Sequence, residues 1–233
     1  LVPPEILRYL IARNKPGKHI EFDTGNALIE LADEYERLQT SNIQYDESMN
    51  RRQKVQYEVN KMALWLSKVN VDDDSKSTNK VTFRHLALLA QIKSNDYDVL
   101  KSLSKSNLLD DLENPPFDLI DKLIKMRNWI NSEHFPQEQR ISINLEHDES
   151  MEVSDIEMKF INELSMNLNN CEWSIEGVNN SIRESATKIE LHLREAFKLL
   201  YKIFLGKERG PKLATILAEL ERKDVTSYLD NFR

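Results

Sequence analysis

Apolar side chains recur every three to four residues along most of the chain, which is the period of an amphipathic α-helix. The widest apolar face belongs to Ile189–Leu205. A helix with so wide a face needs several neighbours to cover it, so this helix is expected at the centre of a bundle. The pattern predicts an all-α fold.

Capping residues and breakers set the expected ends of the helices. Pro4 suits a first helical position, Ser154 with Glu157 has the spacing of a capping box, and Gly206 suits a helix C-terminus. A short apolar piece, Ala63–Val69, surrounds Trp65. The predicted helices are residues 4–13, Asn26–Gln39, Asp46–Lys61, 82–93, Asp96–Lys105, Pro116–Ser132, 154–168, 174–186, Ile189–Leu205 and Lys212–Arg222.

Composition narrows the class of protein. The 233 residues hold one cysteine, Cys171, which excludes an internal disulfide and a multi-cysteine zinc site; no metal site is expected. No apolar run approaches the roughly 20 residues of a membrane span, and no signal peptide is evident at the N-terminus. A cytoplasmic location is expected.

Net charge is −7, which argues against a general nucleic-acid binder, because such proteins usually carry a strongly basic face. Charge is uneven, however. Residues 183–212 hold eight basic and four acidic side chains, a local excess of four positive charges. A protein that reads specific unpaired bases needs only such local positive charge.

Two blocks near the N-terminus, Pro4–Pro16 and Lys18–Gly25, resemble class I lysyl-tRNA synthetases just after their Lys-Met-Ser-Lys-Ser loop. Val81–Leu86 and Leu205–Lys212 are similar to two later elements of the same family. The resemblance implies a stem-contact segment of connector helices (residues 1–70), followed by a helical anticodon-binding region. That region comprises a first part (71–148) and a C-terminal α-helical cage (149–233).

The catalytic elements of that family are missing from the chain. Its five histidines include no His-x-Gly-His, and neither Ser75–Ser77 nor Ser104–Ser106 is preceded by Lys-Met. The resemblance therefore implies the C-terminal part of a lysine–tRNA ligase without catalytic residues, inactive alone. No cofactor is expected in this chain, since ATP and lysine would bind the missing catalytic domain of the same polypeptide.

The expected partners are lysine tRNA and that catalytic domain, with no DNA and no membrane. Recognition of a tRNA loop needs groups that stack on bases and groups that hold phosphates. Arg194, Lys198 and Lys202 recur every four residues and form a stripe along one helix, beside Tyr201. The candidate tRNA-binding residues are Arg194, Lys198, Tyr201, Lys202, Lys207, Arg209, Lys212, Arg8 and Arg13.

Each candidate also has a structural interpretation. The stripe is also consistent with the solvated face of a buried helix, Arg209 with bonds to helix-end carbonyls, and Arg8 and Arg13 with bracing of the catalytic domain. Trp65, Trp129 and Trp173 are expected as core anchors, although Trp173, flanked by polar residues, is also the candidate for stacking on a base. Two other functions stay open: the anticodon-binding region of a related glutamyl-type synthetase, and a helical protein-interaction module.

Overall fold

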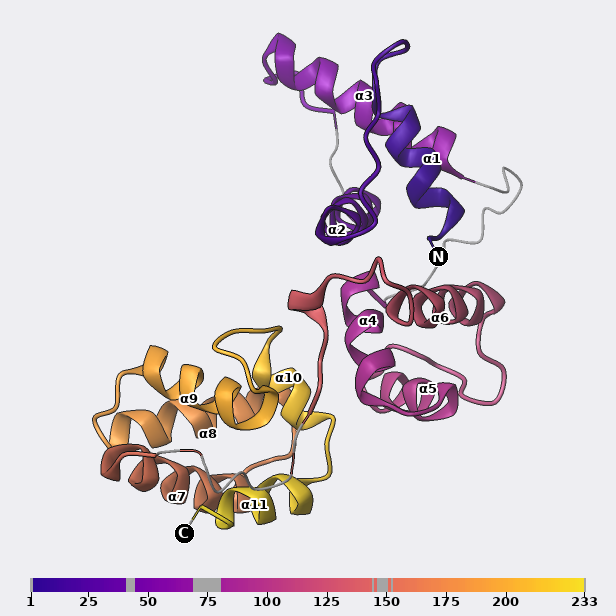
Figure 1. The fold of residues 1–233 in the computed structure, drawn as a ribbon. Coiled ribbons are helices and arrows are strands. Elements are labelled where there is room, and N and C mark those ends of the chain that lie inside the picture. Colours follow the sequence, from indigo (N-terminus) through magenta and orange to yellow (C-terminus); the bar gives the residue numbers. More distant parts are fainter. Residues whose placement is uncertain are drawn as a thin grey trace. The chain divides into compact units, whose positions relative to one another are not determined.

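The computed structural model describes residues 2–40, 45–68, 81–143, 145, 151 and 153–232. Within these ranges the secondary structure is eleven α-helices and a 3-10 turn at Gln137–Gln139, with no strand (Figure 1). The predicted all-α fold is confirmed. None of the described helices combines the length and apolar character that a membrane span requires.

The chain divides into two compact units, Leu1–Gln137 and Glu138–Arg233. The division into residues 1–70, 71–148 and 149–233 concerns function and stays a prediction. Both of its boundaries, between residues 70 and 71 and between residues 148 and 149, fall outside the described residues, as does Ser75–Ser77.

The first unit holds helices α1 to α6. Helix α1 packs on α3 and α2, α2 packs on α4, and α4 packs on α5 and α6. Trp129 is fully buried, its ring centroid 5.5 Å from that of Phe83 and 4.7 Å from that of Phe135. Its indole N–H donates to the carbonyl oxygen of Thr24 at 2.8 Å, so one side chain ties α6 to the start of α2. The helices are α1 (Pro4–Ala12), α2 (Asn26–Thr40), α3 (Arg51–Ser67), α4 (Phe83–Ile92), α5 (Asp96–Lys105) and α6 (Phe117–Ile130).

The second unit holds helices α7 to α11. Helices α8 and α9 pack on each other and on both α7 and α10, and α11 packs on α7 and α10. The rings of Phe204, Tyr228 and Phe232 follow each other at centroid distances of 5.4 and 5.5 Å in its core. The helices are α7 (Asp155–Asn170), α8 (Ile175–Lys188), α9 (Leu193–Leu205), α10 (Leu213–Ala218) and α11 (Arg222–Asp230).

Several predicted ends are confirmed by their caps. The side chain of Thr82 accepts from the backbone N–H of His85 at 3.2 Å and begins α4. Glu157 accepts from the backbone N–H of Ser154 at 2.9 Å at the start of α7. Gly206 ends α9 with a φ of +62°, the left-handed conformation that glycine adopts without steric cost.

Three helical predictions were wrong in extent. Helix α3 begins at Arg51 and runs on through Ala63–Ser67, which the sequence had suggested as a separate piece. Helix α9 begins at Leu193, because Glu190 takes a positive φ of 59° and separates it from α8. The single helix expected at Lys212–Arg222 is α10, which ends at Ala218, followed by the start of α11.

The tryptophans divide between core and surface. Trp129 is a core anchor as predicted, but Trp65 is 58% exposed, so the prediction that it anchors the core was wrong. It lies on a helix whose buried residues are only Ala63 and Ser67, both small.

Candidate functional site

Helix α9 carries four of the predicted site residues on its solvent side. Arg194, Lys198 and Lys202 are exposed, and Tyr201 is half-buried beside them. Burial of Ala196, Leu199, Leu200, Ile203, Phe204 and Leu205 against α7, α8 and α10 fixes the rotation of the helix. The expectation that α9 contacts several neighbours is confirmed, and the basic stripe follows from which face those neighbours cover.

The turn between α9 and α10 is held onto α9 by Tyr201. Its hydroxyl donates to the carbonyl oxygen of Pro211 at 2.7 Å and also lies 3.2 Å from that of Gly210. A Cβ at Gly210 would lie 3.3 Å from the Tyr201 ring and 3.3 Å from Leu205, so glycine lets the turn approach the helix closely. Burial raises the pKa of the Tyr201 hydroxyl, which therefore stays protonated and able to donate.

Two of the lysines near this turn have partners within the unit. Lys207 donates to the carbonyl oxygen of Arg140 at 2.9 Å, which ties the turn to the segment before α7. Lys198 forms an ion pair with Glu208 at 2.9 Å. The hydrogen bond from Lys198 and its positive charge lower the pKa of the Glu208 carboxyl, with a smaller contribution from Lys202.

The remaining predicted cations on α9 and the turn after it differ from Lys198 and Lys207. Among the residues that the structure describes, the side chains of Arg194, Lys202, Arg209 and Lys212 form no hydrogen bond or ion pair, and all four are exposed. We call these four residues the open cations. Exposed cations beside a turn that Tyr201 and Lys207 hold in place are suited to contacting successive phosphates.

Helix α10 does not add an anion site at its N-terminus. It is six residues long and begins at Leu213, with Lys212 rather than Pro211 before it. The charge near this turn therefore comes from side chains.

Trp173 lies half-buried where the end of α7, the start of α8 and the end of α10 meet. Its indole N–H donates to the carbonyl oxygen of Leu220 at 2.9 Å. The guanidinium carbon of Arg222 lies 5.3 Å from the ring centroid, and the same group donates to the carbonyl oxygens of Asn169 and Cys171 at 3.0 and 2.7 Å. Arg222 was not among the predicted residues, since nothing in the sequence links position 222 to Trp173.

In the first unit, Arg8 lies on α1 and Arg13 caps its C-terminus, and both have partners in neighbouring helices. Arg8 donates through Nε to the carbonyl oxygen of Leu66 at 3.1 Å and so fixes α1 to the end of α3. Arg13 forms an ion pair with Glu34 of α2, and its guanidinium lies 5.7 Å from the ring of Tyr9. Tyr9 donates to the same carboxylate at 2.7 Å. Burial, and next the bond to Glu34, raise the pKa of Tyr9 to about 12.

The structure also describes the second serine–lysine–serine sequence. Ser104 and Lys105 end α5, and Ser106 caps its C-terminus. It is therefore a helix end, in a unit without a strand among the described residues.

The chain is similar to known proteins over nearly all of its length. Residues 1–63 match the model of the family described as tRNA synthetases class I (K). The lysine–tRNA ligase of Picrophilus torridus is 32% identical over 95% of this chain and 41% of its own length. The lysine–tRNA ligases of Thermoplasma acidophilum and Pyrococcus horikoshii are each 30% identical, over 99% and 98% of this chain and 43% of their own lengths. The resemblance in the sequence is thus confirmed, and the chain spans about two fifths of the length of the curated relatives it matches.

Proposed function

We propose that this chain is the C-terminal, tRNA-recognising portion of a class I lysine–tRNA ligase. Its similarity to lysine–tRNA ligases extends over nearly all of its length and about two fifths of theirs. The structural observation that carries the proposal is the set of open cations around the turn that follows α9. Unit 2 binds the anticodon arm through this surface.

Phosphate contacts set the register of the RNA on unit 2. Lys202, Arg209 and Lys212 supply positive charge without first breaking an existing ion pair, whereas Lys198 must be shared with Glu208. Tyr201 and Lys207 act by positioning the turn, because each already bonds to backbone carbonyls. In unit 2, the residues proposed to bind phosphate directly are therefore the open cations.

Bases of the anticodon loop add specificity by stacking and by hydrogen bonds along their edges. A base that stacks on Trp173 does so on ring surface that Arg222 leaves uncovered. Each stacked base contributes about 1–3 kcal/mol.

In unit 1, Arg8 contacts the RNA stem. Only its Nε is engaged within the described residues, so the remainder of the guanidinium can bind a phosphate. The charge of Arg13 is balanced by Glu34, and this residue holds α1 against α2.

The parent enzyme attaches lysine to tRNA with ATP, and both small molecules bind the part of the polypeptide beyond this chain. Without a His-x-Gly-His or Lys-Met-Ser-Lys-Ser element, the 233-residue chain activates no lysine by itself. Measurement of ATP–pyrophosphate exchange tests this statement, and any lysine-dependent exchange above background contradicts it.

Binding of lysine tRNA by the purified chain tests the function. Arg209→Ala and Lys202→Ala should each weaken binding by about 1–2 kcal/mol, or roughly five- to thirtyfold. Each should also flatten the dependence of log K on log salt by about 0.7–1. Lys223→Ala, which removes an exposed lysine from α11, is the matched control and should leave affinity unchanged.

Three outcomes overturn the proposal. Tighter binding of glutamate tRNA than of lysine tRNA assigns the chain to a glutamyl-type synthetase. No tRNA binding even at low salt, with a protein partner that stays bound at high salt, assigns a protein-interaction module. Equal effects of Lys202→Ala and Lys223→Ala remove α9 from the site.

A further inference from the structure

Helix α3 has an apolar stripe that the other described residues leave about half exposed. Val55, Val59, Met62 and Leu66 are spaced by four, three and four residues, so they line one side of the helix from its second turn to its end. Their exposed fractions are 57, 39, 56 and 42%. We call these four residues the α3 stripe.

The stripe is separate from the face with which α3 packs in its own unit. Helix α3 contacts α1 and α2, and only Ala63 and Ser67 are buried in those contacts. The bond from Arg8 to the carbonyl oxygen of Leu66 fixes the rotation of α3 against α1. Packing among the described residues of unit 1 therefore leaves the stripe partly exposed.

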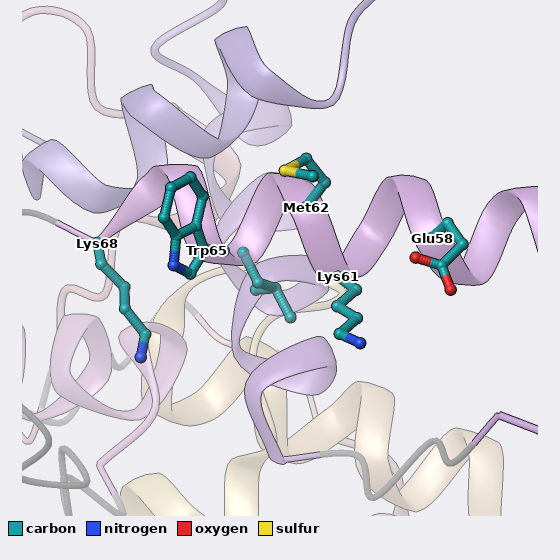
Figure 2. Close-up of a pocket in the computed structure, with 6 residues that line it drawn as sticks. Glu58, Lys61, Met62, Trp65 and Lys68 are labelled. Atoms are coloured by element: carbon teal, nitrogen blue, oxygen red, sulfur yellow. The ribbon is translucent and has the colours of Figure 1, made fainter. Parts of the chain in front are cut away.

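An open hollow adjoins the stripe. It is lined by Glu58, Lys61, Met62 and Trp65 from the last turns of α3 and by Lys68 just after the helix, as Figure 2 shows. Exposed apolar side chains in a row beside a hollow make this side of α3 a candidate interaction surface.

The charges around the stripe are mostly positive. Helix α3 with Lys68 carries five basic side chains and one acidic one, in a chain whose net charge is −7. The surface that covers the stripe is therefore expected to be apolar with an acidic rim. The basic residues are Arg51, Arg52, Lys54, Lys61 and Lys68, and the acidic one is Glu58.

We propose that the α3 stripe is the docking surface for the remaining, catalytic part of the same polypeptide. This inference rests on the proposed function. The relatives are more than twice as long as this chain, so the portion beyond it is large enough to cover a helix. Residues 1–63, which match the synthetase family model, include three of the four stripe residues.

Physical size favours a tethered partner over a second copy of the chain. Four aliphatic side chains form a small contact compared with the roughly 800 Å² that each partner buries in a standard interface. A segment of the same polypeptide meets the stripe at an effective concentration in the millimolar range, so a small contact suffices. Aliphatic groups also offer phosphates no hydrogen bond, which favours a protein surface over RNA.

Thiol labelling tests the proposal directly. Met62→Cys is made in a Cys171→Ser background, both in the 233-residue chain and in the full-length polypeptide. Its modification rate is followed by mass spectrometry of the peptide that contains residue 62. Phe117→Cys, at an 84% exposed position of α6 in the same unit, is the matched control.

Residue 62 should react at least about tenfold more slowly in the full-length polypeptide, equivalent to about 1.4 kcal/mol of protection. Residue 117 should react equally in both. Equal rates at residue 62 overturn the proposal. Protection that depends on the concentration of the 233-residue chain indicates a dimer, and protection only after addition of lysine tRNA indicates an RNA contact; either result also overturns it.

A second measurement guards against an effect of the cysteine itself. Val55→Glu should lower the melting temperature of the full-length polypeptide and leave that of the 233-residue chain nearly unchanged, because Val55 is already 57% exposed there. Lysine-tRNA binding by the 233-residue chain is measured separately. Protection of residue 62 without tRNA binding would refute the proposed function and leave the docking surface standing.

Discussion

The hydroxyl of Tyr201 donates a hydrogen bond to the carbonyl oxygen of Pro211 at 2.7 Å, ten residues further along the chain. This bond makes the position of the turn depend on the rotation of α9. The same rotation places Arg194 and Lys202 in solvent. One helix thus sets both the basic stripe and the turn that bears Arg209.

Tyr201→Phe should lower the free energy of unfolding by about 1 kcal/mol, since the ring packing against Gly210 stays and the hydrogen bond is lost. Lysine-tRNA affinity should fall as well, because the turn with Arg209 loses its support. Urea unfolding and filter binding measure the two effects. Tyr97→Phe, at a 58% exposed tyrosine of α5, is the control and should change neither. Unchanged affinity in a destabilised Tyr201→Phe variant would separate the turn from RNA binding.

Glu208→Gln should strengthen tRNA binding. The substitution releases Lys198 from its ion pair and removes a negative charge beside the stripe. An increase of about two- to fivefold at low salt is expected, within the range of exposed charge pairs. Because Lys198 lowers the pKa of Glu208, the carboxylate stays ionised at neutral and mildly acidic pH, so the gain should be the same under both conditions. Glu184→Gln on α8 serves as the control, and weaker binding by Glu208→Gln would argue that the ion pair itself orders the site.

Arg222→Ala should destabilise unit 2 by about 2 kcal/mol. It removes two hydrogen bonds to carbonyl oxygens and a cation above the Trp173 ring. Thermal unfolding measures the loss, and the tryptophan emission spectrum should change, an effect absent in a Trp173→Phe background. Arg222→Lys keeps the charge but not the paired donors, so it should recover part of the stability. Full stability in Arg222→Ala would contradict this account of the clamp.

Tyr9 should make unit 1 sensitive to alkaline pH. Burial and Glu34 raise its pKa from 10.0 to about 12 in the folded chain, so folding favours the protonated hydroxyl. The stabilisation of the folded unit by the protonated Tyr9 hydroxyl is fully present below pH 10 and is lost as the pH rises through about 12. Urea unfolding at pH 8 and pH 11 should therefore show a steeper loss of stability in the wild type than in Tyr9→Phe. Parallel losses in the two proteins would exclude Tyr9 as the source.

Local chemistry made much of the fold predictable. Helices α4, α5 and α7 follow from caps that involve neighbouring residues, such as Ser154 with Glu157. The residues at Pro4–Gly25 are enough by themselves to indicate the family. Signals of this kind act over three or four residues and do not depend on the rest of the fold.

The predictions failed in two situations. In one, the apolar period continues across a residue that breaks the helix; in the other, the apolar residues of a helix remain exposed. Ile189 and Leu191 keep the helical period through the left-handed Glu190, so the start of α9 could not be read from spacing. The α3 stripe has a helical period but remains exposed, whereas small residues, Ala63 and Ser67, make the buried face.

The sequence by itself determined the helical content, the family resemblance and the list of candidate cations. Only the tertiary structure decided which of them are open: Glu34 lies 21 residues from Arg13, and Arg140 lies 67 residues from Lys207. The contact between Arg222 and Trp173 likewise joins the beginnings of two helices. Charge and periodicity are properties of a segment, but whether a side chain meets a partner or water depends on segments that are distant in the chain.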